Sequence, residues 1–408
     1  MILRLKPHSQ KTVVFAWFTN HVGGLEQLML IRARWFVIKG YRVVILTADG
    51  PMTPMYERAG ATVATFSRLE NDFVALGERR LMCRLREVDA LIGVSEADVF
   101  YIGYDQKSFW VLAQLAQLRP ARCVRLILEY VALKIFHGFL AKDLQEFGAS
   151  RRIICINEAS RLYLSSHHGV TTHASIVVPI PVLPVLPSAT EAAFTSSAHP
   201  IVVTAARLEE MKEYLFGMVE GAGLFFREFP DGLLVVVGDG SYRPELTDMA
   251  AKYGRRVVFT GMVDPSEYVN LIKKGTLFVG MGTAAVQAGM IGLPVVIATA
   301  YDGTFSSPGY LSEQAPGDFG EEVEGKGSTD GWELVLRLLR DRRRLQVEGL
   351  ACREYASTVF ELEKNMRRFE ELMSAVPTGV PDVRRPSFPQ SGLWKKVLKK
   401  ILINLRFR

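Results

Sequence analysis

Two glycines and a threonine in the second half of the chain have the types and spacing of an anion site. Gly280, Gly282 and Thr283 lie in the stretch 276–299, which reads T-L-F-V-G-M-G-T-A-A-V-Q-A-G-M-I-G-L-P-V-V-I-A-T. Glycine allows a sharp turn and threonine is a favoured N-cap, so free N–H groups and the positive end of a helix dipole would face an anion. We expect a phosphate there, although such a turn also occurs where a chain needs only a tight connection.

The elements around these residues follow from the hydrophobic pattern. We expect a strand at 276–279, a turn at 280–283, a small-residue helix at 284–291 and a buried strand at 293–298. The stretch also fits G-x-G-x-x-A with Asp302 about twenty residues further on, which is the dinucleotide-binding pattern. Taken alone, it therefore also allows a nicotinamide dehydrogenase.

Length and composition indicate a globular protein of more than one domain. The chain has 408 residues, of which 49% are hydrophobic and 23% charged, so two domains are expected. No run of about 18 uncharged apolar residues occurs, and residues 1–12 lack the apolar core of a signal peptide. We therefore expect a cytoplasmic protein without a spanning helix.

Cysteine and charge exclude further classes. The four cysteines have no metal-type spacing, which predicts reduced, mostly buried thiols with neither disulfide nor zinc. They are Cys83, Cys123, Cys155 and Cys352. The net charge of +6 is modest and partly concentrated at the C-terminus, so nucleic acid is not an expected partner.

The first half alternates strands with helices, which predicts a parallel sheet covered on both faces. It opens with a strand at 12–17, a loop with Gly23 and Gly24, a helix at 25–39 and a strand at 41–47. Further strands are expected at 61–66, 97–102, 122–128 and 152–156, and helices at 76–88, 106–118, 131–146 and 158–167. Loops at the carboxyl ends of such strands line the binding crevice.

The second half restarts the alternation after a proline-rich change of composition between 177 and 200. We expect strands at 201–205, 232–237 and 257–260, and helices at 214–228, 243–253 and 265–274. A loop-rich piece at 305–327 precedes helices expected at 332–340 and 353–375. The two halves thus share one α/β architecture.

Short motifs recur in order along both halves. After the glycine pair of the first loop come A-R-L-E-E-M-K, V-V-G-D-G-S, V-V-F-T-G-M-V and G-L-P-V-V. With them the chain, over residues 12–375, resembles GT-B glycosyltransferases, nearest the large retaining family that includes sucrose synthases and many bacterial polysaccharide and lipopolysaccharide enzymes (group 1 type). The resemblance implies two Rossmann-like domains that face a cleft. It also implies transfer of a sugar from a nucleotide-sugar donor to a lipid-linked or polysaccharide acceptor, with retention.

The resemblance assigns the central charges of the site to Arg207 and Lys212, which would bind the pyrophosphate of the donor. Negative charge grows on the leaving phosphate as the glycosidic C–O bond breaks, so two fixed cations stabilise the transition state more than the ground state. No metal or other cofactor is then expected. The competing interpretation is a solvated surface pair.

Further donor contacts follow from the same resemblance. The glycine loop of the first domain would approach the donor phosphates, and the segment after the strand at 257–260 would form a shelf for the nucleobase. The implied donor-binding residues are Gly23, Gly24, Gly238, Gly261, Met262, Val263, Gly282, Thr283, Ala284 and Gln287. Gly238 and Gly240 are also explained by a tight turn, and His21 and Glu26 could contact acceptor hydroxyls.

The chain departs from the family at two carboxylates. Where the family has two glutamates eight residues apart, this sequence has Val279 and Gln287. Glutamine both donates and accepts hydrogen bonds and could still bind ribose hydroxyls, whereas valine cannot replace a carboxylate. For an acid or base in the first domain we expect Glu129, with His137 as a histidine that its neighbours satisfy.

The expected organisation has six parts. They are an N-terminal acceptor domain at 1–180, a linker at 181–199, a C-terminal donor domain at 200–352, a helix packing back towards the N-terminal domain at 353–375, a proline-rich tether at 376–392 and a basic amphipathic helix at 393–408. The last segment, L-W-K-K-V-L-K-K-I-L-I-N-L-R-F-R, places apolar residues on one stripe and cations on the other faces. This pattern suits an anionic membrane surface, so we expect a peripheral protein on the inner face of the cytoplasmic membrane. A helix docked on its own domain is the alternative.

Two other functions remain open at this point. A sugar-nucleotide epimerase has the same overall fold but requires carboxylates and histidines around the sugar. A catalytically silent nucleotide-sugar binding subunit would explain the missing glutamates. A dehydrogenase explains only the stretch 276–299.

Overall fold

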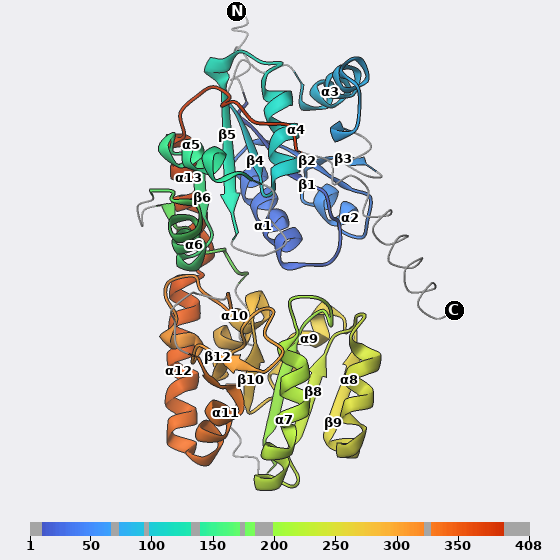
Figure 1. The fold of residues 1–408 in the computed structure, drawn as a ribbon, viewed down its shortest axis with the longest axis vertical. Helices are drawn as coiled ribbons and strands as arrows, with labels where there is room; N and C mark the ends of the chain where they lie inside the picture. The colour runs from blue at the N-terminus through green and yellow to red at the C-terminus, as the bar shows by residue number, and fades with distance from the viewer. Residues whose placement is uncertain are drawn as a thin grey trace, which may run out of the picture. The chain divides into compact units, whose positions relative to one another are not determined.

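The computed structural model describes residues 10–66, 73–93, 98–131, 139–171, 176–183, 199–321 and 328–386. The chain divides into two compact units. Among the described residues, the first unit comprises those within 10–130, 139–153 and 375–386, and the second comprises 131 and those within 154–374. Figure 1 shows the elements of each unit.

The first unit is built on a parallel sheet with the strand order β3-β2-β1-β4-β5-β6. Its strands are β1 (Thr12–Trp17), β2 (Arg42–Ala48), β3 (Thr62–Phe66), β4 (Val99–Gly103), β5 (Val124–Tyr130) and β6 (Ile153–Cys155), the last ending where the two units divide. Every residue of β1 is buried, because T-V-V-F-A-W is a continuous apolar run of the kind that parallel sheets cover on both faces. The helices are α1 (Gly24–Ile38), α2 (Thr53–Arg58), α3 (Glu78–Ile92), α4 (Gln106–Ala116) and α5 (Ala141–Ala149).

The second unit repeats this topology with the order β11-β10-β7-β8-β9. Its strands are β7 (Ile201–Ala205), β8 (Leu233–Val237), β9 (Val257–Gly261), β10 (Leu277–Gly280) and β11 (Val295–Ile297). Both sheets are parallel. In each sheet, the next two strands of the sequence lie on one side of the first strand and the later strands lie on its other side. This is the doubly wound arrangement of Rossmann-like domains. Its helices are α6 (Glu158–His168), α7 (Tyr214–Glu228), α8 (Arg243–Ala250), α9 (Pro265–Ile272), α10 (Gly282–Met290), α11 (Gly331–Arg340), α12 (Arg342–Val359) and α13 (Leu362–Ala375).

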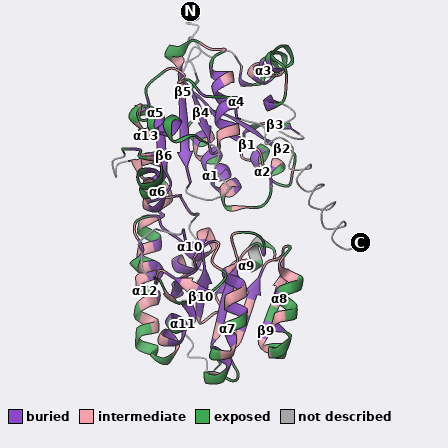
Figure 2. Ribbon diagram, in the orientation of Figure 1, coloured by how far each residue is buried: buried purple, intermediate pink, exposed green. Residues whose placement is uncertain are grey.

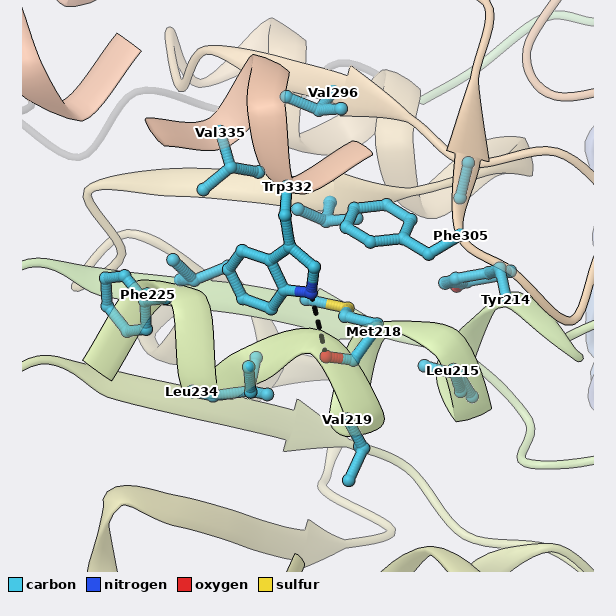
Figure 3. Close-up of a cluster of buried hydrophobic side chains, with 14 of the residues drawn as sticks. Tyr214, Leu215, Met218, Val219, Phe225, Leu234, Val296, Phe305, Trp332 and Val335 are labelled. Carbon is cyan, nitrogen blue, oxygen red and sulfur yellow. Dashed lines mark hydrogen bonds between the residues drawn. The ribbon is translucent and has the colours of Figure 1, made fainter. Parts of the chain in front are cut away.

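The core of the second unit centres on Trp332 of α11, which is 2% exposed. Its indole N–H donates to the carbonyl of Met218 in α7 at 3.0 Å, and its ring stacks on Phe225 with centroids 5.7 Å apart (Figure 3). Phe305 meets the same ring edge-on at 5.8 Å. These contacts fix α7 against α11 and thereby hold the start of α7, which follows the loop of Arg207 and Lys212. Figure 2 shows the strands buried and the outer helix faces exposed in both units.

Several expected elements differ from the structure. Of the helix expected at 131–146, residues 132–138 lie outside the described residues, and α5 covers Ala141–Ala149. The stretch expected at 353–375 is the end of α12 followed by α13. The break comes at Phe360, which is fully buried, and Glu361 accepts hydrogen bonds from the N–H groups of Glu363 and Lys364 at the start of α13. The loop-rich piece contains the two-residue strand β12 (Ser306–Ser307), which pairs antiparallel with β13 (Thr329–Asp330).

The expected proline-rich tether packs on the first unit over residues 376–386. The side chain of Arg125 donates to the carbonyl of Val376 at 3.0 Å, Gly379 forms a β-bridge with Arg125, and Arg385 donates to the carbonyl of Val74 at 2.7 Å. An extended segment exposes carbonyl groups that neighbouring arginines can reach, which explains why this part of the tether is packed rather than free. The expected helix at 393–408, the linker residues 184–198 and His137 lie outside the described residues.

Membrane and cysteine predictions have separate outcomes. Within the described ranges, no helix combines the length and apolar character needed to cross a membrane. The four cysteines are free; Cys155 and Cys352 are buried as expected, whereas Cys83 is exposed and Cys123 partly exposed.

Candidate active site

Loops of the second unit meet at the carboxyl edge of its sheet, where α/β proteins bind ligands. In the loop after β7, the N–H of Leu208 donates to the carbonyl of Asp239 at 2.9 Å, and the N–H of Tyr242 donates to the carbonyl of Leu208 at 2.8 Å. On the other side of this loop, the N–H of Tyr301 donates to the carbonyl of Met211 at 3.3 Å. Backbone hydrogen bonds therefore link the loops that follow β7, β8 and β11.

Arg207 and Lys212 occupy the two ends of the β7–α7 loop. The side chain of Arg207 is 49% exposed, and its guanidinium lies 3.9 Å from the carboxylate of Glu209. Lys212 is partly buried, and burial together with the positive charge of Arg207 lowers the pKa of its ammonium to about 8, against the opposing charges of Glu321 and Glu213. The two cations are therefore close enough for their charges to interact. A bound anion would relieve this repulsion.

Backbone strain marks the same loop. Met211 has φ +80° and Tyr301 has φ +60°, a left-handed conformation that costs about 1–3 kcal/mol for a residue with a side chain. These two residues are joined by the backbone hydrogen bond between the β7–α7 loop and the loop after β11. Such strain persists only where the surroundings determine the conformation, and it clusters at binding sites.

The start of α10 differs in detail from the sequence prediction. Its N-cap is Met281, which makes no side-chain capping bond, so the prediction that Thr283 caps the helix was wrong. The helix begins at Gly282, which adopts φ +69°, a conformation that favours glycine, and the N–H of Gly282 donates to the carbonyl of Phe319 at 2.8 Å. That N–H is therefore already used within the protein.

The next residues of α10 retain the predicted character of an anion site. Thr283 and Ala284 are partly exposed, and in the part of the chain that the structure covers their N–H groups have no backbone acceptor. Gln287 lies in the second turn of the helix and is also partly exposed. The first turn thus offers two N–H groups and the positive end of the helix dipole to an anion.

The glycines after β8 serve close packing. Gly238 has φ +126°, and a Cβ there would overlap the carbonyl oxygen of Ala206. Gly240 has φ +156°, and a Cβ there would overlap the carbonyl of Leu208. Gly238 therefore brings the β8–α8 loop against the β7–α7 loop, and its N–H donates to the carbonyl of Gly261 at 3.0 Å.

The expected nucleobase shelf follows β9. Gly261 ends the strand with φ +73°, and a Cβ there would lie 2.9 Å from the guanidinium of Arg243. The next residue, Met262, is 67% exposed, and Val263 is partly exposed. An exposed thioether beside a buried glycine is a surface on which a flat ring can lie.

A carboxylate that the sequence analysis missed, Glu321, raises the pKa of Lys212 by its charge. Glu321 is 6% exposed, and its oxygens accept hydrogen bonds from the N–H of Phe319 at 3.0 Å and from the side chain of Asn157. Burial raises the pKa of this carboxyl to about 7, with the nearby charge of Asp318 acting in the same direction. The segment was treated as a loop-rich piece; its only sequence signal is a pair of acidic residues within G-D-F-G-E.

In the first unit, the glycine loop begins α1. Gly23 is the N-cap of the helix, and a Cβ on Gly24 would meet no other atom within 4 Å, so the fold itself does not demand glycine at 24. Glu26 is 4% exposed because one of its oxygens accepts from Trp17 at 3.1 Å and from Thr19 at 2.6 Å. Glu26 is thus committed to the interior rather than to an acceptor, whereas His21 is exposed.

Glu129 is placed differently from the expected acid or base. The side chain is fully buried and forms an ion pair with Arg32, which is also fully buried. Burial raises the pKa of the Glu129 carboxyl, while Arg32 and Tyr104 lower it. A carboxylate with no exposed surface cannot exchange protons with a substrate in this conformation, so the structure gives Glu129 the role of joining β5 to α1.

Asp302 does not fit the role that a dinucleotide fingerprint requires. One oxygen of its carboxylate accepts hydrogen bonds from the N–H of Thr304 at 3.0 Å and from the hydroxyl of that residue at 2.6 Å, so it caps its own loop. Across the described ranges, no three or more His, Cys, Asp or Glu side chains are grouped as metal ligands.

Comparison with known proteins supports these features. Residues 191–306, which include Arg207, Lys212 and most of the α10 region, match the model for glycosyl transferases group 1. A GDP-mannose-dependent monoacylated alpha-(1-6)-phosphatidylinositol monomannoside mannosyltransferase of Corynebacterium glutamicum is 24% identical over 161 residues. That match covers 36% of this chain and 40% of the relative, so it spans less than half of the relative's length.

Solved structures match nearly the whole chain. A glycosyltransferase from Rickettsia africae has a TM-score of 0.65 at 14% identity, covering 90% of this chain and 99% of that one. A mutant of S. aureus TarM, in complex with Fondaparinux, alpha-GlcNAc-glycerol and UDP, has a TM-score of 0.62 at 11% identity, covering 89% and 99%. A protein described as a putative UDP-N-acetylglucosamine 2-epimerase, from Listeria monocytogenes, has a TM-score of 0.50 at 13% identity, covering 92% and 99%. Similarity at these identities shows the fold and does not separate transferase from epimerase. Residues 191–306 therefore match the family of glycosyl transferases group 1, and the chain that carries them has the GT-B fold.

Proposed function

We propose that the protein is a glycosyltransferase that moves a sugar from a nucleotide-sugar donor to a lipid-linked or polysaccharide acceptor, with retention, in the synthesis of a cell-surface glycan. The observation that carries the proposal is that the loop with Arg207 and Lys212 and the first turn of α10 follow neighbouring strands, β7 and β10, at the carboxyl edge of one sheet. The match of residues 191–306 to group 1 glycosyl transferases supports it. So does the UDP in the similar TarM complex.

The chemistry follows from these charges. The anomeric carbon exchanges its bond to the donor phosphate oxygen for a bond to the oxygen of an acceptor hydroxyl. The electron pair of the broken bond stays on the departing diphosphate, and an oxygen of that diphosphate takes up the proton that the acceptor hydroxyl loses. Arg207 and Lys212 stabilise that growing negative charge, and the N–H groups of Thr283 and Ala284 can bind the same phosphates. Gln287 is assigned to the ribose hydroxyls. In this proposal the protein needs no metal ion, so treatment with EDTA leaves turnover unchanged.

The acceptor side of the proposal concerns a membrane. The named relative of Corynebacterium glutamicum acts on a phosphatidylinositol mannoside, which is a lipid. The basic amphipathic sequence at 393–408 suits an anionic membrane surface, and a lipid-linked acceptor would give that segment a purpose. We therefore assign the protein to the inner face of the cytoplasmic membrane as a peripheral enzyme.

The decisive experiment measures release of nucleoside diphosphate from a panel of nucleotide-sugars, with and without a membrane extract as acceptor. Release that depends on the extract supports a transferase. Interconversion of the donor without release would assign an epimerase, and binding without turnover would assign a silent binding subunit. Either of these last two results contradicts the proposal.

Variants connect this activity to the site. Arg207→Ala and Lys212→Ala should each lower kcat at least about a hundredfold, because loss of one charge-stabilising contact costs about 2.7–4 kcal/mol in the transition state. Arg227→Ala is the matched control, since Arg227 is an exposed cation in the last turn of α7 of the same unit. Near-normal turnover in both site variants would remove Arg207 and Lys212 from the donor site.

A further inference from the structure

The loop 315–321 connects two helix starts of the second unit, and we call it the 315–321 strap. At one end, the N–H of Ala159 in the first turn of α6 donates to the carboxylate of Asp318 at 2.8 Å. The hydroxyl of Tyr355 donates to the carbonyl of Ala315 at 2.8 Å. A Cβ on Gly317 would lie only 3.1 Å from Asn157, the N-cap of α6. The strap is therefore packed closely on the start of α6.

The other end of the strap contacts the start of α10. The carbonyl of Phe319 accepts the N–H of Gly282, and the carbonyl of Gly320 accepts the N–H of Ala300, each at 2.8 Å. Gly320 has φ +122°, and a Cβ there would lie 2.5 Å from Met281, the N-cap of α10. The conformation of the strap thus determines where the first turn of α10 lies.

Glu321 closes the strap and its charge reaches Lys212. Its carboxylate accepts from the N–H of Phe319 and from Asn157, so one side chain ties the strap back to α6. Its charge acts on Lys212, as do those of Arg207 and Glu213, and Asp318 is the acidic neighbour of Glu321 itself. Of the two anions that favour the charged ammonium of Lys212, Glu321 is the stronger.

We propose that Glu321 is a positioning residue of the donor site, which keeps Lys212 charged and, through Phe319, fixes the first turn of α10 against the donor diphosphate. The inference rests on the proposed function, because it assigns the diphosphate to Lys212 and α10. Glu321 does not touch the donor; it acts through these two partners.

The test is the affinity of the purified full-length protein for UDP and for GDP as a function of pH, in wild type and Glu321→Gln. Affinity in the wild type falls above about pH 8, where Lys212 loses its proton. Loss of the Glu321 charge lowers the pKa of Lys212 further, so the fall in affinity should begin at a lower pH in the variant, and the variant should bind more weakly than the wild type at pH 9. At pH 6 the two proteins should differ less than about twofold, because the Glu321 carboxyl of the wild type is then itself protonated.

Three further variants separate a charge effect from a loosened strap. With Lys212→Arg, which stays charged, replacing Glu321 by Gln should no longer change the pH dependence. Asp318→Asn should lower thermal stability, since Asp318 accepts a hydrogen bond from the start of α6. It should not shift the pH at which affinity falls, since its charge is not among those that act on Lys212. Glu321→Asp keeps the charge on a shorter side chain. The pH above which its affinity falls should therefore stay near that of the wild type, even though its thermal stability is lower. This last variant keeps the proposal testable if Glu321→Gln does not fold.

Different outcomes would contradict the role of Glu321 and the proposed function. The role of Glu321 would be overturned if the affinity fell at the same alkaline pH in the wild type and in Glu321→Gln. It would also be overturned if Glu321→Gln shifted this fall equally in the Lys212→Arg background. A wild-type protein that binds neither UDP nor GDP would instead overturn the proposed function.

Discussion

Lys212 carries a charge that its surroundings oppose, and this sets a pH limit on activity. Burial and the charge of Arg207 lower the pKa of the ammonium to about 8. Lys212 is therefore cationic below pH 8 and becomes neutral as pH rises through that value, so the stabilisation of the leaving diphosphate is lost on the alkaline side. We expect kcat/KM to fall about tenfold per pH unit above that pKa. In Lys212→Arg this fall should disappear. If kcat/KM of that variant still fell at the same pH, the fall would be due to the titration of another group.

Gln287 tests whether an amide can serve where related enzymes have a carboxylate. It lies partly exposed in the second turn of α10. Loss of one neutral hydrogen bond of about 1 kcal/mol should raise the donor KM about fivefold in Gln287→Ala with little change in kcat. Gln287→Glu, which still accepts from a hydroxyl, should keep KM within about twofold of the wild type. An unchanged KM in the alanine variant would make Gln287 a surface residue of the helix.

Glu129 separates structural from chemical roles. Because its partner Arg32 is fully buried, Glu129→Gln leaves an unpaired charge inside the first unit and should lower the free energy of unfolding by about 3–5 kcal/mol. Denaturant unfolding measures this, and Arg32→Met combined with Glu129→Leu should recover much of the loss since both charges are removed. Full stability of Glu129→Gln with a shifted pH profile of turnover would restore the original assignment as acid or base.

The residues that the sequence could not reveal are those whose partners are remote. The glycines and the Arg–Lys pair could be proposed from the sequence because each belongs to a short motif beside a strand. Asn157 and Glu321, by contrast, are 164 positions apart and lie next to no motif. The burial of Glu129 depends on Arg32, which is 97 positions away. Such pairs become visible only when the sheet brings the loops together.

At the scale of elements, the apolar runs predicted most strands within one or two residues, and β1, β7 and α7 have the expected bounds. Helix ends were less predictable, because they depend on tertiary contacts. The 353–375 region reads as one amphipathic helix, yet the burial of Phe360 divides it into α12 and α13. The strained Met211 and the early start of α10 at Gly282 likewise follow from hydrogen bonds to other loops.

Trp332 tests how far the packing of α11 supports the site. Trp332→Ala removes a large buried ring and should cost about 3–5 kcal/mol of unfolding free energy. Trp332→Phe keeps an aromatic ring but loses the hydrogen bond to the carbonyl of Met218, which adds the net contribution of one hydrogen bond, about 0.5–1.5 kcal/mol, to the cost of the smaller ring. Thermal unfolding distinguishes them, and equal stability of the wild type and the alanine variant would contradict the packing shown in Figure 3.

At the scale of the whole molecule, the prediction concerns residues 393–408, which lie outside the described part. Each cation near an anionic surface contributes about 1 kcal/mol, so the full-length protein should sediment with anionic vesicles at low salt and be released at high salt. Deletion of 394–408 should abolish this sedimentation. Substitution of Lys395, Lys396, Lys399 and Lys400 by Gln is the matched control for charge alone. An unchanged, salt-insensitive distribution after deletion would favour a helix docked on the folded body.

The return of residues 375–386 to the first unit has a consequence for synthesis on the ribosome. Arg385 bonds the carbonyl of Val74, 311 positions earlier, so the first unit cannot be completed until almost the whole chain has been translated. The second unit, at 154–374, is translated in between, which takes roughly 10–45 s at about 5–20 residues per second. A nascent chain therefore finishes its second unit first, and during that interval the first unit waits without its last segment. Chaperones that bind incompletely packed chains have their opportunity in this interval.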